Sequence, residues 1–325
     1  MKILVLGASG FAGRPLVREL LARGHEVVGA GRSPEPPPAM AARGAGPAWL
    51  PCDVTDPEAV RATLGAALPE AVVVLSGLAS PPAANRAAPE AFRVNALGVV
   101  HLLDAIERGG GRIRAAIVTS SEVYGAGGSA GSPIHESEPL RPATLYGASK
   151  AAADHAAMAF AARGLDVVVL RPFNHAGAGQ KRDFVCADFA HQLVEIARGR
   201  RESVMEVGDL DVQRDFTDVR DIVRGYALGV ERGRAGEAYN LCSGRPTSIR
   251  EILSMLCDLA GVAPEIRSTA VRRRAGEPGV VFGSPAKAAE HLGWQPEIPL
   301  REMLAWVLDD AVARLEVAPP DAAGG

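Results

Sequence analysis

The opening residues of the chain constrain its fold more than any other stretch. The apolar run Lys2–Leu6 passes directly into the turn Gly7-Ala8-Ser9-Gly10-Phe11-Ala12-Gly13, and residues 14–23 have the pattern of a helix. The order strand, glycine turn, helix places backbone N–H groups and a helix N-terminus where a pyrophosphate can bind. The spacing G-x-x-G-x-x-G differs from the commoner G-x-G-x-x-G fingerprint, so the glycines alone are weak evidence. Their position between a strand and a helix favours a dinucleotide-binding turn over an incidental one.

Short apolar runs alternate with helical patterns up to residue 170. This alternation predicts an α/β fold, a Rossmann-type doubly wound parallel sheet. At 325 residues the chain is long enough for two domains. We expect a dinucleotide-binding domain over residues 1–170, a smaller and mainly substrate-binding lobe over 171–316 that contributes little to the central sheet, and a disordered tail over 317–325. The predicted strands are 2–6, 26–30, 48–51, 71–75, 115–118 and 165–170.

A second informative stretch follows the apolar residues 115–118. Ser120 should lie where this buried strand ends. Tyr146 and Lys150 are four residues apart at the start of a predicted helix, which places the phenol and the ammonium on one face. A phenol whose unperturbed pKa is ~10 needs a nearby cation to exchange a proton at neutral pH, and Lys150 is placed to be that cation. Tyr-x-x-x-Lys occurs by chance on many helices, but the glycine turn of the same domain favours a role in proton transfer.

The end of the second predicted strand indicates which dinucleotide is bound. NAD-binding domains usually place an acidic residue there for the ribose 2′-hydroxyl, whereas an arginine accommodates the 2′-phosphate of NADP. This chain has Gly31-Arg32-Ser33. The sequence therefore favours NADP(H). The alternative is that Arg32 is a solvated loop residue and the enzyme takes either NADP(H) or NAD(H).

Composition excludes several other classes of function. The net charge is −3 with 22% charged residues, so no basic surface predicts a nucleic-acid partner. The apolar segments are short, which argues against a signal peptide or a membrane span. Four cysteines without paired spacing, and histidines without neighbouring ligands, predict reduced thiols in the cytoplasm and no metal site; the cysteines are Cys52, Cys186, Cys242 and Cys257.

Taken together, four motifs resemble the extended short-chain dehydrogenases/reductases, the superfamily of nucleotide-sugar epimerases, dehydratases and reductases. They are the glycine turn, the serine after the fifth strand, Tyr146-x-x-x-Lys150 and the turn Arg171-Pro-Phe-Asn174, and they cover nearly the whole chain in order. The resemblance and the strand order together imply a set of cofactor contacts. These are Gly7, Ser9, Gly10, Phe11, Ala12, Arg32, Ser33, Asp53, Val54, Leu75, Ser76, Gly77, Asn95, Tyr146, Lys150 and Phe173.

The second half of the chain is similar to a narrower group, the GDP-4-keto-6-deoxy-D-mannose reductases, which make GDP-D-rhamnose. The resemblance rests on Arg171-Pro-Phe-Asn-His175, Gly177-x-Gly-Gln180, the segment from Gly208 to Asp221 and Tyr239-Asn-Leu-Cys-Ser-Gly244. Two positions depart from that group: Gly31 stands where it commonly has an acidic residue, and Gly177-Ala-Gly-Gln180 where it more often has Gly-Pro-Gly-Gln.

The resemblance implies roles for the central residues. Tyr146 would donate a proton to a ketone oxygen at sugar C4, Ser120 would hold that oxygen, and Lys150 would lower the phenol pKa and bond the nicotinamide ribose. Ser121 competes with Ser120 for the serine role and is otherwise a substrate contact. Glu122 is assigned a substrate contact only, although a carboxylate in this loop removes a proton in related dehydratases.

The remaining expected substrate contacts are Asn174, Gln180, Arg214 and Arg274. The two arginines would bind the diphosphate, because each presents a planar fork to phosphate oxygens; whether Arg272, Arg273 or Arg274 points inward stays open. The implied reaction is reduction of a GDP-linked 4-ketohexose. The alternatives are a nucleotide-sugar 4-epimerase, a 4,6-dehydratase, or a reductase of another nucleotide-linked keto sugar in a bacterial secondary-metabolite pathway; a non-catalytic dinucleotide sensor is disfavoured because serine, tyrosine and lysine are all present.

The helices that carry Asn95 and Tyr146 resemble those that form a four-helix dimer interface in this superfamily. Their small and apolar residues would allow close packing between two subunits, which predicts a homodimer. The alternative is packing on the parent sheet. The residues concerned are Leu97, Val100, Leu103, Ile106 and the alanines 151–153, 156 and 157.

Overall fold

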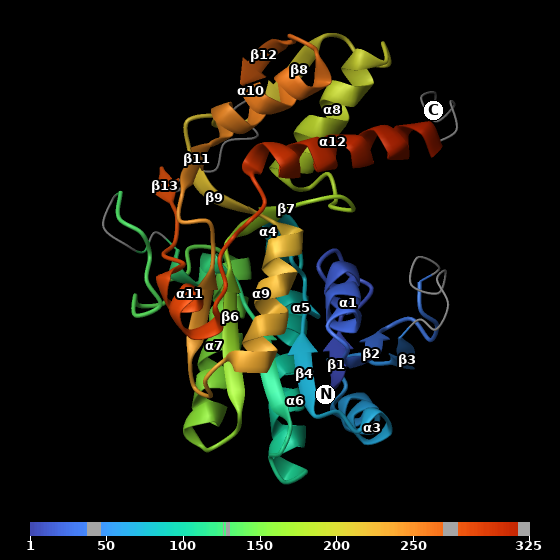
Figure 1. Cartoon of the computed structure of the whole chain (residues 1–325), viewed down its shortest axis with the longest axis vertical. Coiled ribbons are helices and arrows are strands. Elements are labelled where there is room, and N and C mark those ends of the chain that lie inside the picture. Colours follow the sequence, from blue (N-terminus) through green and yellow to red (C-terminus); the bar gives the residue numbers. More distant parts are fainter. Residues whose placement is uncertain (38–46, 126, 128–130, 269–278, 318–325) are drawn as a thin grey trace.

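The computed structural model describes residues 1–37, 47–125, 127, 131–268 and 279–317. Its centre is a seven-stranded parallel sheet in the order β10-β6-β5-β4-β1-β2-β3 (Figure 1). This confirms the expected Rossmann-type doubly wound α/β fold. The strands are β1 (Lys2–Leu6), β2 (Glu26–Gly31), β3 (Ala48–Pro51), β4 (Ala71–Val74), β5 (Arg114–Val118), β6 (Val167–Pro172) and β10 (Ala238–Leu241).

Each face of the sheet is covered by helices, and the side chains of β1 alternate between the two resulting cores. Ile3 and Val5 pack with α1 (Gly13–Ala22), α9 (Val219–Arg232) and α11 (Ala286–Leu292). Leu4 and Leu6 pack on the other face, because successive strand residues point to opposite sides. That face is covered by α3 (Pro57–Ala67), α6 (Gly98–Arg108) and α7 (Leu145–Ala162).

Short elements join the strands of the sheet to these helices. They are α4 (Pro81–Arg86), α5 (Ala88–Phe92), the π-helical turn η1 (Arg93–Leu97) and the 3-10 turn η2 (Ser121–Tyr124).

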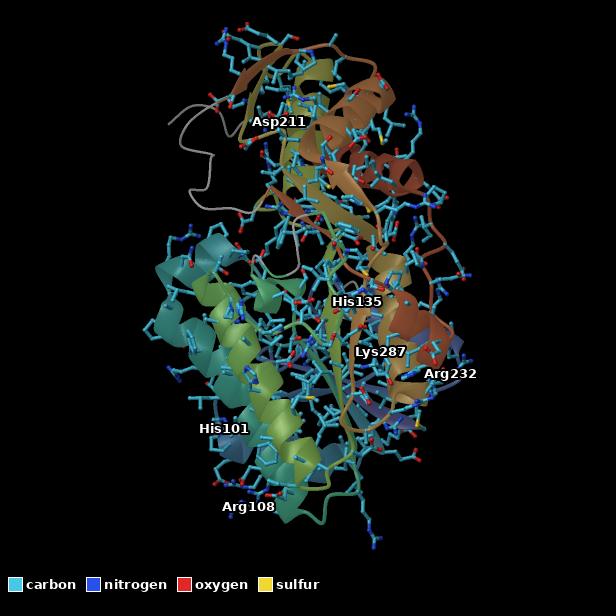
Figure 2. All side chains as sticks on the ribbon, turned by 90° about the vertical axis from the view of Figure 1, so that its left-hand side faces the viewer. His101, Arg108, His135, Asp211, Arg232 and Lys287 are labelled. Carbon is cyan, nitrogen blue, oxygen red and sulfur yellow. The ribbon has the colours of Figure 1, made fainter. Side chains whose placement is uncertain are left out.

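The lobe lies beyond the carboxyl ends of the central strands and has its own apolar core (Figure 1). It contains α8 (Val185–Ala197), α10 (Ile249–Ala260) and α12 (Leu300–Val317), with the strands β7 (Asn174–Ala176), β8 (Val204–Val207), β9 (Gln213–Asp218), β11 (Pro246–Ser248), β12 (Glu265–Ser268) and β13 (Val280–Val281). In the side view, Asp211 marks the lobe and Arg108 the opposite end of the molecule (Figure 2).

Two expectations about the lobe need correction. Residues after 170 supply β10, an edge strand of the central sheet, and also α9 and α11 on one of its faces. The four residues of β10 are too few for periodicity to show which sheet they join. Residues 208–216, expected as a loop, include the start of β9. The expected tail lies outside the described residues apart from Val317, which ends α12.

None of the helices that the structure describes is long and apolar enough to cross a lipid bilayer.

Candidate active site

The glycine turn joins β1 to α1 at the carboxyl edge of the sheet. Gly7 has a φ of +86°, and a Cβ there would lie 2.7 Å from the backbone nitrogen of Ser76, which follows β4. A Cβ at Gly13 would lie 2.3 Å from the Gly7 carbonyl oxygen. Glycine therefore lets α1 approach the turn closely, and no side chain of the described residues caps the start of α1. The positive end of a helix dipole behind a glycine turn fits a pyrophosphate, so this turn suits a dinucleotide.

Ser120, Tyr146 and Lys150 are brought together at the same edge. Ser120 follows β5 and caps η2, where its Oγ accepts a hydrogen bond of 3.2 Å from the Glu122 nitrogen. Thr144 caps α7 by accepting from the Gly147 nitrogen at 2.9 Å, which places Tyr146 and Lys150 in the first two turns. Their side chains are 7% and 6% exposed.

Burial is the largest cause of the pKa shifts of both Tyr146 and Lys150. Burial raises the pKa of Tyr146 to about 12; the charge of Glu122 acts in the same direction, and a hydrogen bond with the Ser120 hydroxyl acts against it. Burial lowers the pKa of Lys150 to about 8. Burial disfavours the phenolate, and the Lys150 ammonium donates to the Val118 carbonyl at 3.0 Å. The effect of Lys150 on the phenol pKa stays a prediction.

A buried network of hydrogen bonds holds the segment around Ser120, here called the serine loop (residues 119–124), against the helix that carries Tyr146. Arg171 Nη2 and Nε donate to the two oxygens of Asp154 at 2.7 and 2.8 Å, and Arg171 Nη1 donates to the Tyr124 hydroxyl at 2.8 Å. The Thr119 hydroxyl donates to Asp154 at 3.1 Å, and the Tyr124 hydroxyl donates to Asn240 Oδ1 at 2.8 Å. Asp154 belongs to the Tyr146 helix, whereas Thr119 and Tyr124 flank Ser120. The network therefore fixes the serine relative to the tyrosine.

Most of the expected cofactor residues lie at this edge of the sheet. Arg32, Ser33 and Asp53 are exposed beyond β2 and β3, and Val54 is buried behind them. Hydrogen bonds from Thr55 lower the pKa of Asp53, and the positive charge of Arg32 adds to the effect. The others follow β1 or β4: Ser9, Gly10, Phe11, Ala12, Leu75, Ser76 and Gly77.

Two expected cofactor contacts have structural roles in this structure. Asn95 is buried in η1, where its Nδ2 donates to Ser149 Oγ at 2.8 Å and its Oδ1 accepts from the Leu78 nitrogen at 2.8 Å. It thus ties the loop after β4 to α7. The Phe173 ring is 3% exposed and packs in an apolar cluster with Tyr124. Neither surrounding is visible in the sequence, because the partners come from distant segments.

The expected substrate residues are less uniform in their placement. Asn174 is exposed on β7, whereas Gln180 is 4% exposed and its Nε2 donates to the His175 carbonyl at 2.9 Å. Ser121 is buried, while Ser120 is the serine that meets Tyr146. Arg214 is half-buried on β9. Arg274, with the alternatives Arg272 and Arg273, lies outside the described residues.

Two residues that matter at this edge were not singled out from the sequence. His175 stacks on Phe11 of the glycine turn with ring centroids 5.9 Å apart. Its Nδ1 lies 2.9 Å from the Phe173 carbonyl, and burial lowers its pKa. Asp215 accepts from Ser243 Oγ at 2.6 Å and from the Gly244 nitrogen at 2.9 Å, which gives the Arg214-Asp215 and Ser243-Gly244 motifs a structural purpose. Both contacts join segments that are distant in the sequence.

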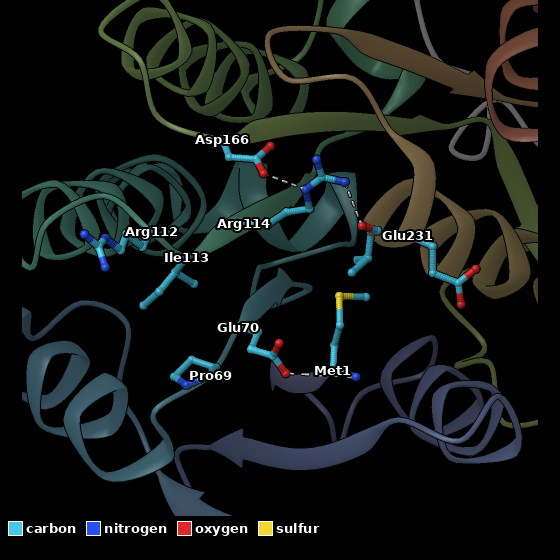
Figure 3. Close-up of a pocket in the computed structure, with 9 residues that line it drawn as sticks. Met1, Pro69, Glu70, Arg112, Ile113, Arg114, Asp166 and Glu231 are labelled. Atoms are coloured by element: carbon cyan, nitrogen blue, oxygen red, sulfur yellow. Dashed lines mark hydrogen bonds and ion pairs between the residues drawn. The ribbon is translucent and has the colours of Figure 1, made fainter.

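A cavity of about 440 Å³ lies elsewhere, at the amino ends of the strands (Figure 3). Met1, Glu70 and Arg114 line it, and Arg114 is paired with Asp166 at 2.8 Å. Ligands of open parallel sheets bind beyond the carboxyl ends instead. This cavity is therefore separate from the site of Ser120, Tyr146 and Lys150.

Comparison with known proteins agrees with this arrangement. The model of the NAD dependent epimerase/dehydratase family matches residues 3–242. The chain is 37% identical over 264 residues to the GDP-6-deoxy-D-mannose reductase of Pseudomonas aeruginosa, which covers 81% of this chain and 86% of that protein.

Two solved structures extend the likeness over the whole fold. RMD from Pseudomonas aeruginosa in complex with NADPH is 34% identical, with a TM-score of 0.82 over 96% of this chain and 99% of that one. The UDP-glucose 4-epimerase of Thermus thermophilus in complex with NAD is 28% identical, with a TM-score of 0.83 over 96% and 99%. The chain therefore belongs to the NAD dependent epimerase/dehydratase family, among the extended short-chain dehydrogenases/reductases.

Proposed function

We propose that this protein catalyses the NAD(P)H-dependent reduction of the 4-keto group of a nucleotide-linked 6-deoxyhexose, converting GDP-4-keto-6-deoxy-D-mannose to GDP-D-rhamnose. The observation that carries the proposal is the meeting of Ser120 and Tyr146, with Lys150 beside them, at the edge that also holds the glycine turn. The 37% identity to a GDP-6-deoxy-D-mannose reductase supports this substrate class.

In this reaction Tyr146 is the general acid. NADPH held at the glycine turn would supply the hydride for C4. As negative charge develops on the carbonyl oxygen, the Ser120 hydroxyl donates a hydrogen bond to it and the Tyr146 phenol transfers its proton to it. A phenol with a pKa of about 12 is protonated at neutral pH, as a donor must be. Lys150, charged below pH 8, would bond the nicotinamide ribose.

The end of β2 supports NADP(H) over NAD(H). Gly31 provides no carboxylate for a ribose 2′-hydroxyl, and the exposed Arg32 and Ser33 can hold a 2′-phosphate. The complex of RMD with NADPH is consistent with this choice.

For the other end of the substrate we assign the diphosphate to Arg214 and Arg274, and sugar or phosphate hydrogen bonds to Asn174. The buried Gln180 would act by holding the loop of residues 174–180.

Glu122 supports a second candidate function, epimerisation or 4,6-dehydration. Its carboxylate accepts from Thr144 Oγ1 at 3.3 Å and acts on the pKa of Tyr146, so a carboxylate does lie near the proposed acid. Reduction consumes cofactor in proportion to product, whereas epimerisation and dehydration return it unchanged.

The test follows the loss of NADPH or NADH absorbance with GDP-4-keto-6-deoxymannose, beside the dTDP- and UDP-linked 4-keto sugars. The proposal predicts stoichiometric oxidation of NADPH with the GDP sugar and slower oxidation with the others. Conversion of a 4-hydroxy nucleotide sugar without added cofactor, with no oxidation by any keto sugar, would replace the proposal with the second candidate.

We also propose that the protein is a cytoplasmic homodimer. Leu103 and Ile106 are buried in the parent core, so they do not form the outer face of α6. Leu97 is 49% exposed at the end of η1, and the half-buried Val100 lies one turn further along. Of the alanines expected at the interface, Ala151, Ala153 and Ala157 are buried within the subunit. Leu97, Val100 and the half-buried Ala152 and Ala156 leave a small apolar face suited to a second subunit.

A further inference from the structure

Trp49 occupies the space beside the end of β2. The register of the sheet pairs Trp49 with Gly29 and Pro51 with Gly31. A Cβ at Gly29 would lie 3.0 Å from Cε3 of the indole, and a Cβ at Gly31 would lie 3.1 and 3.2 Å from Cζ2 and Cη2. The indole therefore lies flat along the two glycines and fills the room that side chains on this face would need.

The indole is also held in place by a hydrogen bond. Its Nε1 donates to the Ser33 carbonyl at 2.9 Å, beyond the end of β2. The ring packs against the core that contains α1, and a Cβ at Gly31 would lie 3.5 Å from Ser9 Oγ of the glycine turn. Moving the ring would expose apolar surface and leave the carbonyl without this partner, so the indole is not a flexible neighbour.

These contacts bear on cofactor choice, because the end of β2 is where an acidic side chain binds the ribose 2′-hydroxyl of NAD. We propose that Trp49 is a specificity-determining residue: its indole excludes an acidic side chain at position 31 and fixes the Arg32-Ser33 turn for a 2′-phosphate. The inference rests on the cofactor part of the proposed function. It assigns selectivity to the pair Trp49 and Gly31 rather than to Arg32 alone.

The test is a double-variant cycle on cofactor binding, measured by calorimetric titration of NADPH and NADH without any sugar substrate. The variants are Gly31→Asp, Trp49→Val and both together. The wild type should bind NADPH more tightly than NADH. Gly31→Asp alone should weaken NADPH binding without tightening NADH binding, because the carboxylate meets the indole. The double variant should bind NADH about tenfold more tightly than either single variant, the size of one charge-assisted hydrogen bond.

A fourth variant shortens the ring. Trp49→Phe lacks both the N–H group and the indole atoms Cζ2 and Cη2 that face position 31, so with Gly31→Asp it should gain NADH affinity as the Trp49→Val combination does. Circular dichroism and thermal unfolding of each variant establish that it is folded.

Either of two results would overturn the inference: Gly31→Asp alone gaining NADH affinity as fully as the double variant, or folded variants whose effects on binding simply add. These outcomes leave reduction of the sugar untouched. A wild type that binds neither dinucleotide would instead overturn the proposed function, and the inference with it.

Discussion

Tyr146 can serve as the general acid because its phenol keeps its proton until the substrate oxygen takes it. Burial raises its pKa to about 12, so Tyr146→Phe removes the proton donor without changing a charge at neutral pH. We expect kcat to fall by roughly 10²–10⁴-fold, the range for a lost general acid, with NADPH affinity near that of the wild type. Steady-state kinetics and a binding titration measure the two effects.

A matched control comes from another buried tyrosine. The Tyr239 hydroxyl accepts from the Arg234 nitrogen at 3.1 Å, on the edge strand β10 and outside the Ser120 and Lys150 cluster. Tyr239→Phe should therefore leave kcat close to that of the wild type. If Tyr146→Phe turns over as fast as this control, Tyr146 is not the acid.

Lys150 predicts a pH dependence with a definite sign. Burial lowers its pKa from the ordinary value of 10.5 to about 8, so the ammonium is present below pH 8 and is lost above it. kcat/KM for NADPH, which reports groups of the free enzyme, should fall as pH rises through about 8. The Lys150→Arg variant keeps its positive charge over this range. Its kcat/KM for NADPH should be lower than that of the wild type but should not change with pH between 7 and about 9. A wild-type profile without this fall would remove the charge of Lys150 from cofactor binding.

The same shift affects stability in the opposite direction. The folded state releases the Lys150 proton near pH 8, before the unfolded chain does near 10.5. The contribution of Lys150 to the free energy of unfolding should therefore grow as pH rises between these values. Urea unfolding of the wild type and of Lys150→Met at pH 7 and about 9.5 measures this contribution. The stability of the wild type relative to the variant should be greater at the higher pH.

Sequence spacing was enough to find the serine, tyrosine and lysine, because a strand end and an i, i+4 pair are local patterns. It could not give their protonation, since the burial that raises the Tyr146 pKa arises from distant segments. The contact between Trp49 and Gly31 was missed for a related reason: it depends on the register between β2 and β3.

At the scale of elements, the pair formed by Asp154 and Arg171 joins α7 to β6 beneath the serine loop. Arg171→Leu would leave the carboxylate buried without its cation. We expect a loss of about 3–5 kcal/mol in the free energy of unfolding, measured by urea denaturation. The double variant Asp154→Leu/Arg171→Leu should lose less, because no uncompensated charge remains. Equal losses in the two proteins would mean that this pair is not a buried ionic unit.

Element boundaries show where local patterns stop being sufficient. Residues 92–108 have the pattern of one amphipathic helix, but the structure has the π-helical turn η1 before α6. Asn95 lies in that turn and bonds Leu78 and Ser149. The irregularity thus coincides with a side chain whose partners are remote in sequence.

At the scale of the whole molecule, the subunit association can be tested at one residue. Leu97→Glu places a charge on the proposed interface and should convert the dimer to a monomer of 33.8 kDa, measured by sedimentation. Leu21→Glu is the matched control, because Leu21 is similarly exposed, at 40%, on α1 across the sheet. A wild type that sediments as a monomer, or an equal effect of both variants, would contradict the proposed interface.

The two-part arrangement of sheet and lobe was predictable, because the regular alternation of strands and helices ends near residue 170. The sequence did not predict that β10 joins the central sheet and that α9 and α11 cover one of its faces, because these placements depend on contacts between distant parts of the chain.

Hydride delivery to C4 of a GDP-linked sugar can be followed with an isotope. The measurement uses NADPH with deuterium at both hydrogens of nicotinamide C4 and GDP-4-keto-6-deoxymannose as substrate, and the product is analysed by NMR and mass spectrometry. We expect one deuterium bound to C4 of GDP-D-rhamnose for each NADPH oxidised. A product without deuterium, formed while the cofactor remains reduced, would contradict it.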